Sequence, residues 1–196
     1  MGRRPHNSPR VGCFRLSSRV ALLIAVVCLG SAAPAGAETR HDFRLARAVA
    51  TVAGRSVAVS CETDSAAWKR EVSTARLAAQ AVAYYDPDLD RVRFGPVICA
   101  DSAEAPRGAN LRYVRALFLA AHEGAHAAGI EHEGTANCWA LHWAQELARR
   151  YAGVGYVTAA SRRVRLYARQ LHRDSPPAYQ TPCTLSQSTA PIGMRR

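Results

Sequence analysis

Apolar side chains recur every three or four positions through much of the second half of the chain, the period of an amphipathic helix. This spacing predicts a helix over residues 111–128, and Gly129 follows it where a helix commonly ends in a left-handed residue. The same period predicts a helix over residues 132–151, with Gly153 beyond its end, and another over residues 158–172.

The first half of the chain carries shorter segments, which we assign from alternation of apolar and polar residues and from turn residues. They are a helix over 38–54, a strand over 56–61, a loop over 63–72, and two strands over 77–85 and 91–99. The Asp86-Pro87-Asp88 turn between the last two strands predicts a β-hairpin. We therefore expect an α+β fold, in which a small antiparallel sheet packs against the three helices.

The first 37 residues have the pattern of a secretory signal peptide. Five arginines and no acidic residue occupy positions 3–19, an apolar run covers 20–29, and Ala35-Gly36-Ala37 forms a small-x-small cleavage site. The apolar run is shorter than the ~20 residues that a spanning helix needs. We expect cleavage after Ala37, a secreted protein with no stable membrane insertion, one domain over 38–183 and a mobile tail over 184–196.

The charge of the chain is compatible with these expectations. The chain has 26 basic and 15 acidic residues, a formal net charge of +11. Loss of the five arginines of the signal peptide leaves 21 basic and 15 acidic residues, so residues 38–196 carry +6. Basic and aromatic residues are not interleaved as on nucleic-acid-binding surfaces. We expect an exported monomer that binds no nucleic acid, although its charge suits anionic surfaces.

Cysteine usage agrees with export. Cys13 and Cys28 leave with the signal peptide, and four cysteines remain. An even number of cysteines in an exported chain favours disulfides, and no pair has the C-x-x-C spacing of a zinc site. Three pairings are open. We prefer Cys61–Cys99 with Cys138–Cys183, because each bridge then links residues within one half of the domain.

One motif carries candidate chemistry: His122-Glu123-Gly124-Ala125-His126, within the helix predicted over 111–128. Histidines four residues apart lie on one face of a helix, one turn apart, as two ligands of one zinc ion must. Glu123 lies next to them and can accept a proton from an attacking water. Two histidines at a helix end can also be plain surface residues, but the apolar run before the motif predicts a buried helix.

The sequence around the motif resembles zincin metallopeptidases in two ways. Residues 122–132 match the metzincin pattern H-E-x-x-H-x-x-G-x-x-H, which implies His132 as the third zinc ligand. Residues 133–140, with the letters E-G-T-A-N-C-W-A, resemble the second-helix motif E-x-x-A-D-C-Y-A of gluzincin-type metallopeptidases. The second resemblance covers residues 116–142 and implies a zincin-like three-helix core with Glu133 as the third ligand. It also implies that Asn137 takes the place of an Asp that orients a ligand histidine.

Geometry favours Glu133 over His132. If the two helices form a hairpin whose tip follows residue 128, Glu133 lies opposite His126, and Asn137 lies opposite His122. A hydrogen bond from Asn137 would then fix the ring of a ligand histidine.

We therefore expect a secreted peptidase with one Zn²⁺ ion held by His122, His126 and Glu133, and with Glu123 as general base. Its substrate would be a peptide or protein, and the strand at 91–97 could pair with it, as strands beside zincin clefts do. His172 and Tyr179 could donate hydrogen bonds to the transition state, and His142 could lie near the metal. The alternative is a non-catalytic protein that binds zinc or a cell surface.

Overall fold

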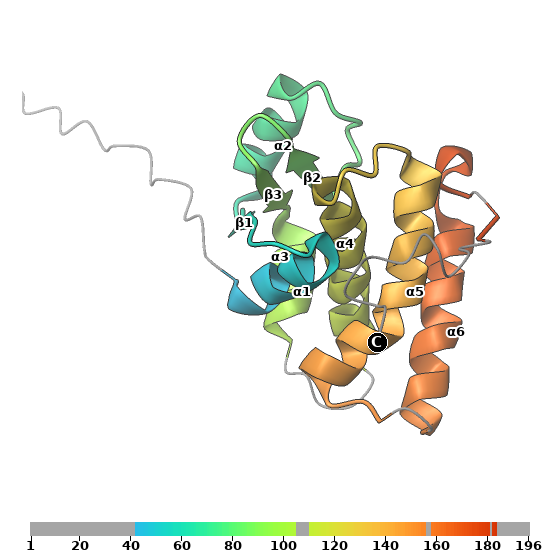
Figure 1. The fold of residues 1–196 in the computed structure, drawn as a ribbon. Coiled ribbons are helices and arrows are strands. Elements are labelled where there is room, and N and C mark those ends of the chain that lie inside the picture. Colours follow the sequence, from blue (N-terminus) through green and yellow to red (C-terminus); the bar gives the residue numbers. More distant parts are fainter. Residues whose placement is uncertain (1–41, 105–109, 156–157, 181, 184–196) are drawn as a thin grey trace, which may run out of the picture. The chain divides into compact units, whose positions relative to one another are not determined.

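The computed structural model describes residues 42–104, 110–155, 158–180 and 182–183. The described residues form six α-helices, three short strands and one 3-10 turn (Figure 1). In chain order these are α1 Phe43–Ala53, β1 Ala58–Cys61, α2 Ser65–Thr74, β2 Ala83–Asp86, β3 Arg91–Phe94, α3 Pro96–Ala103, α4 Leu111–Ala127, α5 Glu133–Ala152, α6 Ala159–Asp174 and η1 Pro177–Tyr179. The predicted α+β class is confirmed, and so are the three long helices to within about two residues at each end.

The sheet is mixed, where we predicted an antiparallel one. Its strand order is β1-β3-β2, with β3 antiparallel to β2 but parallel to β1. Two parallel strands need a crossover connection, and the chain between β1 and the β2–β3 hairpin supplies one through α2. The predicted hairpin is present, but β3 lies in the middle of the sheet and β2 lies at its edge.

The crossover helix α2 replaces the loop predicted over 63–72. Asp64 caps it by accepting a hydrogen bond from the Ala67 N–H at 2.6 Å. Trp68 and Val72, four residues apart, are both buried, and the Trp68 indole N–H donates to the Ala81 carbonyl at 2.9 Å. An Asp followed by two apolar residues at helical spacing was therefore the signal for this helix.

The strand predicted over 91–99 is shorter in the structure, because a helix begins within it. Pro96 occupies the first turn of α3, where its fixed φ suits a helix and its missing N–H costs nothing. A β-carbon on Gly95 would lie 2.6 Å from the Trp68 ring, so no other residue fits without movement. Cys99 consequently lies in α3 and not in a strand.

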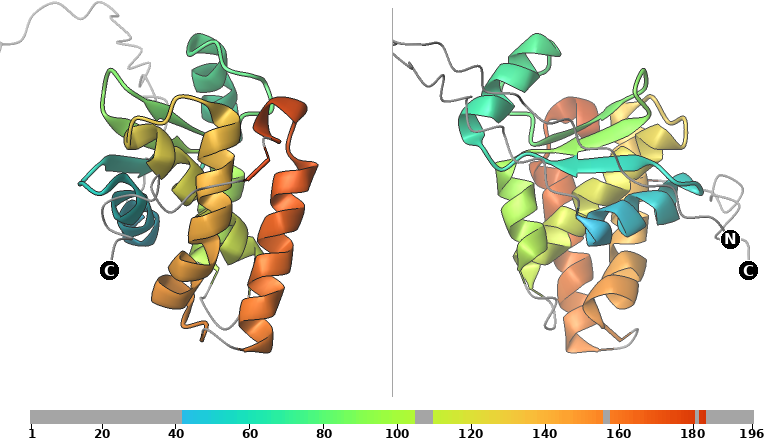
Figure 2. Two further views of the ribbon diagram at one scale, coloured as in Figure 1. Left: turned by 45° about the vertical axis from the view of Figure 1, so that its right-hand side comes forward. Right: turned by 90° about the vertical axis from the view of Figure 1, so that its left-hand side faces the viewer.

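Helix α4 forms the centre of the domain. It contacts α1, α3, α5, α6 and the sheet, and most of its residues are buried. Helix α1 lies beside both β1 and α4 (Figure 2). At Gly124 the two helices approach so closely that an added β-carbon would lie 2.9 Å from Val52 Cβ and 3.0 Å from the Val49 carbonyl oxygen. The glycine inside the sequence motif therefore sets how closely α1 packs against α4.

Both preferred disulfides are present. Cys61–Cys99 joins β1 to α3, and Cys138–Cys183 joins α5 to the chain beyond η1. The expected cleavage site after Ala37, the start of the helix predicted at 38 and the tail over 184–196 lie outside the described residues. Within the described part of the chain, no helix is both long and apolar enough to cross a membrane.

Candidate metal centre

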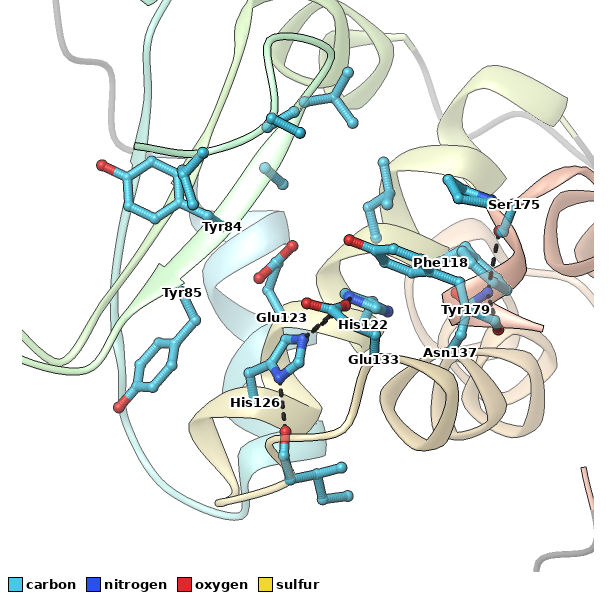
Figure 3. Close-up of a pocket in the computed structure, with 18 of the residues that line it drawn as sticks. Tyr84, Tyr85, Phe118, His122, Glu123, His126, Glu133, Asn137, Ser175 and Tyr179 are labelled. Carbon is cyan, nitrogen blue, oxygen red and sulfur yellow. Dashed lines mark hydrogen bonds and ion pairs between the residues drawn. The ribbon is translucent and has the colours of Figure 1, made fainter. Parts of the chain in front are cut away.

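Helix α4 places His122 and His126 on the face that lines a cavity of about 950 Å³. Their Nε2 atoms lie 3.1 Å apart, and their rings meet edge to face with centroids 4.8 Å apart (Figure 3). The cavity is bounded by α4, by β2 with the chain before it, and by the segment after α6. Both histidines therefore direct the same ring nitrogen into one shared space.

The turn between α4 and α5 brings the third group to this space. Gly129 has a φ of +92°, which only glycine adopts readily, and the Ile130 N–H donates back to the Ala125 carbonyl at 3.0 Å. Helix α5 then begins at Glu133. The Glu133 Oε2 atom lies 3.0 Å from His122 Nε2 and 3.4 Å from His126 Nε2.

His132 takes no part in this cluster. It is exposed, immediately before the first residue of α5. The group whose ligand atoms lie within 4.8 Å of one another consists of His122, His126 and Glu133. Of the two candidates for third ligand, the structure therefore brings Glu133 to the histidines and leaves His132 outside.

The spacing of the three ligand atoms fits a zinc ion. Tetrahedral zinc with bonds of 2.0–2.2 Å to nitrogen and oxygen separates its ligand atoms by about 3.3–3.6 Å. The separations of 3.0, 3.1 and 3.4 Å form one face of a slightly smaller tetrahedron. Little movement would be required of these three side chains on binding a metal.

Hydrogen bonding also prepares the histidines for a cation. The His126 Nδ1–H donates to the Ile130 carbonyl at 2.6 Å, which leaves a lone pair on Nε2 when the ring is neutral. The Nδ1 atom of His122 is buried and has no hydrogen-bond partner among the described residues. Lone pairs that converge on a carboxylate repel one another unless a proton or a metal cation lies between them.

The pKa values of Glu133 and His126 are shifted because these groups lie so close together. Hydrogen bonds from His122 and His126 lower the pKa of Glu133 well below its usual range. Burial lowers the pKa of His126, but the hydrogen bond to Glu133 and the charge of Glu123 outweigh it and raise the pKa. Positive charge at the centre of the cluster is thus favoured.

Glu123 lies beside the cluster and points into the same cavity (Figure 3). Its side chain is buried, and burial raises the pKa of its carboxyl although His122 and His126 oppose this. A carboxylate with a raised pKa, close to a site for a cation, is suited to receive a proton. The structure therefore places all four residues of the predicted site around one space.

The strand that borders the cavity is β2, not the one at 91–97 that we predicted to pair with substrate. Strand β3 is hydrogen-bonded on both sides, to β1 and to β2, so it has no free edge. Among the described strands, β2 pairs only with β3, which leaves its other edge without a partner, and Ala83, Tyr84 and Tyr85 line the cavity. Strand order, which sequence periodicity does not reveal, decides which strand is available.

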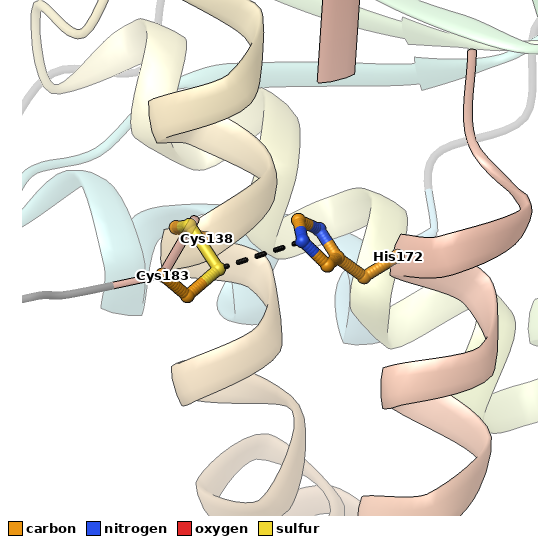
Figure 4. Close-up of side chains that lie close together, drawn as sticks. All are labelled: Cys138, His172 and Cys183. Carbon is orange, nitrogen blue, oxygen red and sulfur yellow. Dashed lines mark hydrogen bonds between the residues drawn. A yellow bond between two sulfur atoms is a disulfide. The ribbon is translucent and has the colours of Figure 1, made fainter. Parts of the chain in front are cut away.

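Tyr179 closes the opposite side of the site. Its ring stacks on His122 with centroids 5.7 Å apart and an interplanar angle of 21°. Burial and the negative charges of Glu133 and Glu123 raise the pKa of its phenol, so the O–H remains a donor at neutral pH. His172, the other candidate donor, instead lies 3.7 Å from Cys183 Sγ beside the disulfide (Figure 4).

Asn137 holds Tyr179 and does not orient a ligand histidine as we predicted. Its Nδ2 group donates to the Tyr179 carbonyl at 3.2 Å and to Ser175 Oγ at 3.1 Å, and it lies 3.3 Å from His172 Nδ1. The segment after α6 occupies the space beside Asn137, and the spacing of residues along the α4–α5 hairpin could not predict this. The predicted Cys138–Cys183 disulfide could have indicated it, because it links that segment to α5.

Neither the residues beside the disulfide nor the remaining histidine of α5 adds a ligand to this centre. Cys138, His172 and Cys183 lie close together, but the two sulfurs form a disulfide and are not thiolate ligands. His142 is exposed on α5 and does not belong to the cluster of His122, His126 and Glu133. Comparisons with known protein families, with curated proteins and with solved structures found no match.

Proposed function

We propose that this protein is an exported zinc-dependent peptidase of the zincin type. The observation that carries the proposal is the convergence of His122, His126 and Glu133 at zinc-ligand distances, with the Glu123 carboxylate in the same cavity. A purely structural zinc site usually has four protein ligands. Three ligands beside a buried acid and a large cavity suit a catalytic site, which leaves one position for water or substrate.

His122, His126 and Glu133 would hold the zinc ion. Bound zinc supplies Lewis-acid chemistry, in that it polarises a carbonyl and makes a water molecule more acidic. Glu123 would take a proton from the attacking water and return it to the leaving amine, for which its raised pKa is suited. The Tyr179 hydroxyl would donate a hydrogen bond to the oxygen that becomes negative in the transition state.

The unpaired edge of β2 would bind the substrate as an added strand. An extended peptide can hydrogen-bond to a free strand edge while its side chains enter the adjoining cavity. Strand β2 meets this requirement, because no described strand pairs with its outer edge and three of its four residues line the cavity. This arrangement supports peptides or unfolded protein segments as the substrate class.

Export is supported by the pattern of the first 37 residues and by the two disulfides, which form and persist in oxidising compartments. The mature enzyme would begin at Glu38. Its net charge of +6 would favour contact with anionic cell surfaces, which is also the property on which the non-catalytic alternative depends.

Metal analysis tests this proposal directly. We expect about one zinc per chain in oxidised protein over residues 38–196, greatly reduced zinc in Glu133→Ala, and unchanged zinc in the matched control His132→Ala. Glu123→Gln should retain zinc but lose hydrolysis of an unfolded protein. Activity that survives Glu123→Gln would exclude the proposed mechanism, and a wild type that takes up no zinc would exclude the enzyme altogether.

A further inference from the structure

The cavity contains a cation that the proposed chemistry does not use. Arg115 lies on α4 seven residues before His122, two helical turns along the same face, or about 10 Å along the axis. It lines the cavity with its side chain 35% exposed. Among the described residues that line this cavity, Arg115 is the only lysine or arginine.

An ion pair fixes the orientation of this guanidinium. The Arg115 Nε–H donates to Asp101 Oδ2 of α3 at 2.6 Å, and the Asp101 side chain is only 5% exposed. This bond uses only the Nε–H of the guanidinium. Among the described residues, the four N–H groups on the two Nη atoms make no hydrogen bond. Asp101 therefore holds Arg115 in place and leaves the N–H groups on its two Nη atoms unused.

The surface between Arg115 and the histidines is apolar. Phe118 and Leu119 lie on α4 between the two, and Leu171 of α6 also lines the cavity. Three acidic residues line the cavity: Glu123 belongs to the motif, Glu131 to the turn after it, and Glu133 is the first residue of α5. The cavity thus combines a candidate metal centre, an apolar wall and a positively charged group about two helical turns away.

We propose that Arg115 selects peptide substrates that carry a carboxylate close to the scissile bond. This inference rests on the proposed peptidase function. The Nη donors of an arginine form a planar fork that matches a carboxylate and can bind it through two parallel hydrogen bonds. An extended chain advances about 3.3 Å per residue, so the carboxylate belongs to a residue within about three positions of the reacting bond.

Two substrate groups share this chemistry. One is the side chain of a glutamate or aspartate, whose methylene groups would lie against Phe118 and Leu119. The other is the C-terminal carboxylate of a peptide, in which case the enzyme would release short fragments from chain ends. Both require the charge and the fork of Arg115, and blocking the C-terminus separates them.

Arg115 and Asp101 could instead serve only to join α4 to α3. That role predicts lower stability when the pair is disrupted, but no change in the preference between charged and neutral peptides. Selectivity between ligands, measured in folded protein, therefore separates recognition from a structural role.

Binding can be measured without turnover in zinc-loaded Glu123→Gln protein. We would titrate three peptides of identical length: one with an internal Glu and an amidated C-terminus, one with Gln in its place and the same amide, and the Gln peptide with a free C-terminus. Isothermal calorimetry should show at least one of the carboxylate peptides binding on the order of tenfold tighter than the neutral one. Tighter binding of the Glu amide assigns the side chain, and tighter binding of the free acid assigns the C-terminus.

Variants at two positions of α4 provide the comparison. Arg115→Gln should reduce the preference to within about twofold, whereas Arg112→Gln, which removes an exposed arginine paired with Glu104 outside the cavity, should leave it unchanged. If Arg115→Gln does not fold because Asp101 loses its partner, Arg115→Lys keeps the charge without the fork and should lose most of the preference.

Equal affinity for all three peptides, or no binding of any, would overturn this inference. So would a preference that Arg115→Gln leaves intact. These outcomes differ from failure of the proposed function: zinc-dependent hydrolysis of all three peptides at equal rates would leave the peptidase intact and remove the role of Arg115. Conversely, a carboxylate preference that Arg115→Gln abolishes in a protein that binds no zinc would keep the Arg115 site and remove the peptidase.

Discussion

The α4–α5 hairpin and the walls of the cavity are built in different ways. The hairpin carries the whole ligand cluster within a sequence separation of eleven residues, and one glycine turn positions it. The walls come from β2, almost forty residues before the motif, and from the chain after α6, which a disulfide ties to α5. Metal binding should therefore depend on local structure, whereas substrate binding should depend on the tertiary fold. Each of the following changes affects either the α4–α5 hairpin or the tertiary structure around the cavity.

The double variant Cys138→Ser/Cys183→Ser should have the largest effect on stability. Closing a chain separation of 45 residues is worth about 4 kcal/mol in the entropic account of disulfides. Chemical unfolding should show this loss, while zinc content at saturating zinc stays at one per chain, because neither cysteine belongs to the ligand cluster. Loss of zinc from folded double variant would contradict the local origin of the metal site.

His122→Ala should weaken zinc binding by at least about a hundredfold, since even residues that only orient a ligand contribute 10- to 100-fold to metal affinity. Competition with a chelating dye would measure this change. The matched control His142→Ala removes an exposed histidine of α5 and should leave affinity within about twofold. A similar loss in both variants would mean that the zinc is held elsewhere.

Gly124→Ala tests the packing beneath the motif. The new methyl group would meet Val52 and the Val49 carbonyl at about 3 Å, so α1 must move away from α4. We expect a loss of about 1–3 kcal/mol in the free energy of unfolding, measured in urea. Gln170→Ala, on the exposed side of α6, should change stability by less than about 0.5 kcal/mol. Unchanged stability in Gly124→Ala would show that the helices are not in such close contact.

Lowering the pH should reduce the stability of the region around β2, and we expect this effect to be the smallest of those predicted. Burial raises the pKa of Glu71, but hydrogen bonds from Arg93 and Tyr84 outweigh it and lower the pKa below the ordinary 4.5. The folded state therefore gains stability from ionised Glu71 above pH 4.5 and loses it as the pH falls through the lowered value. Urea midpoints at pH 6 and pH 3.5 should differ less in Glu71→Gln than in wild type, and an equal difference would exclude this contribution.

The same contrast explains what the sequence could predict. Helices α4, α5 and α6 were correct because apolar period, caps and glycines are local signals, and the hairpin they imply brought Glu133 to the histidines. The direction of β1 relative to β3 was predicted wrongly, because it depends on the crossover helix α2. That helix was not predicted, because its many polar residues obscured two buried positions at helical spacing. Tyr179 was named as a candidate donor, but nothing in the sequence selected it over His172. The contact between Asn137 and Tyr179 was missed because it spans 42 residues of sequence and no periodicity encodes it.

If the protein is exported as proposed, the position of Cys183 would set an order for its assembly. A chain that entered the export compartment from its N-terminus would deliver His122, His126, Glu133 and Cys138 before the cysteine that pairs with Cys138. During this interval the ligand hairpin can form and take up zinc while the wall that carries Tyr179 is still absent. Oxidation of Cys183 would then be the step that encloses the site, so the proposed metal would have access to its ligands before the cavity is complete.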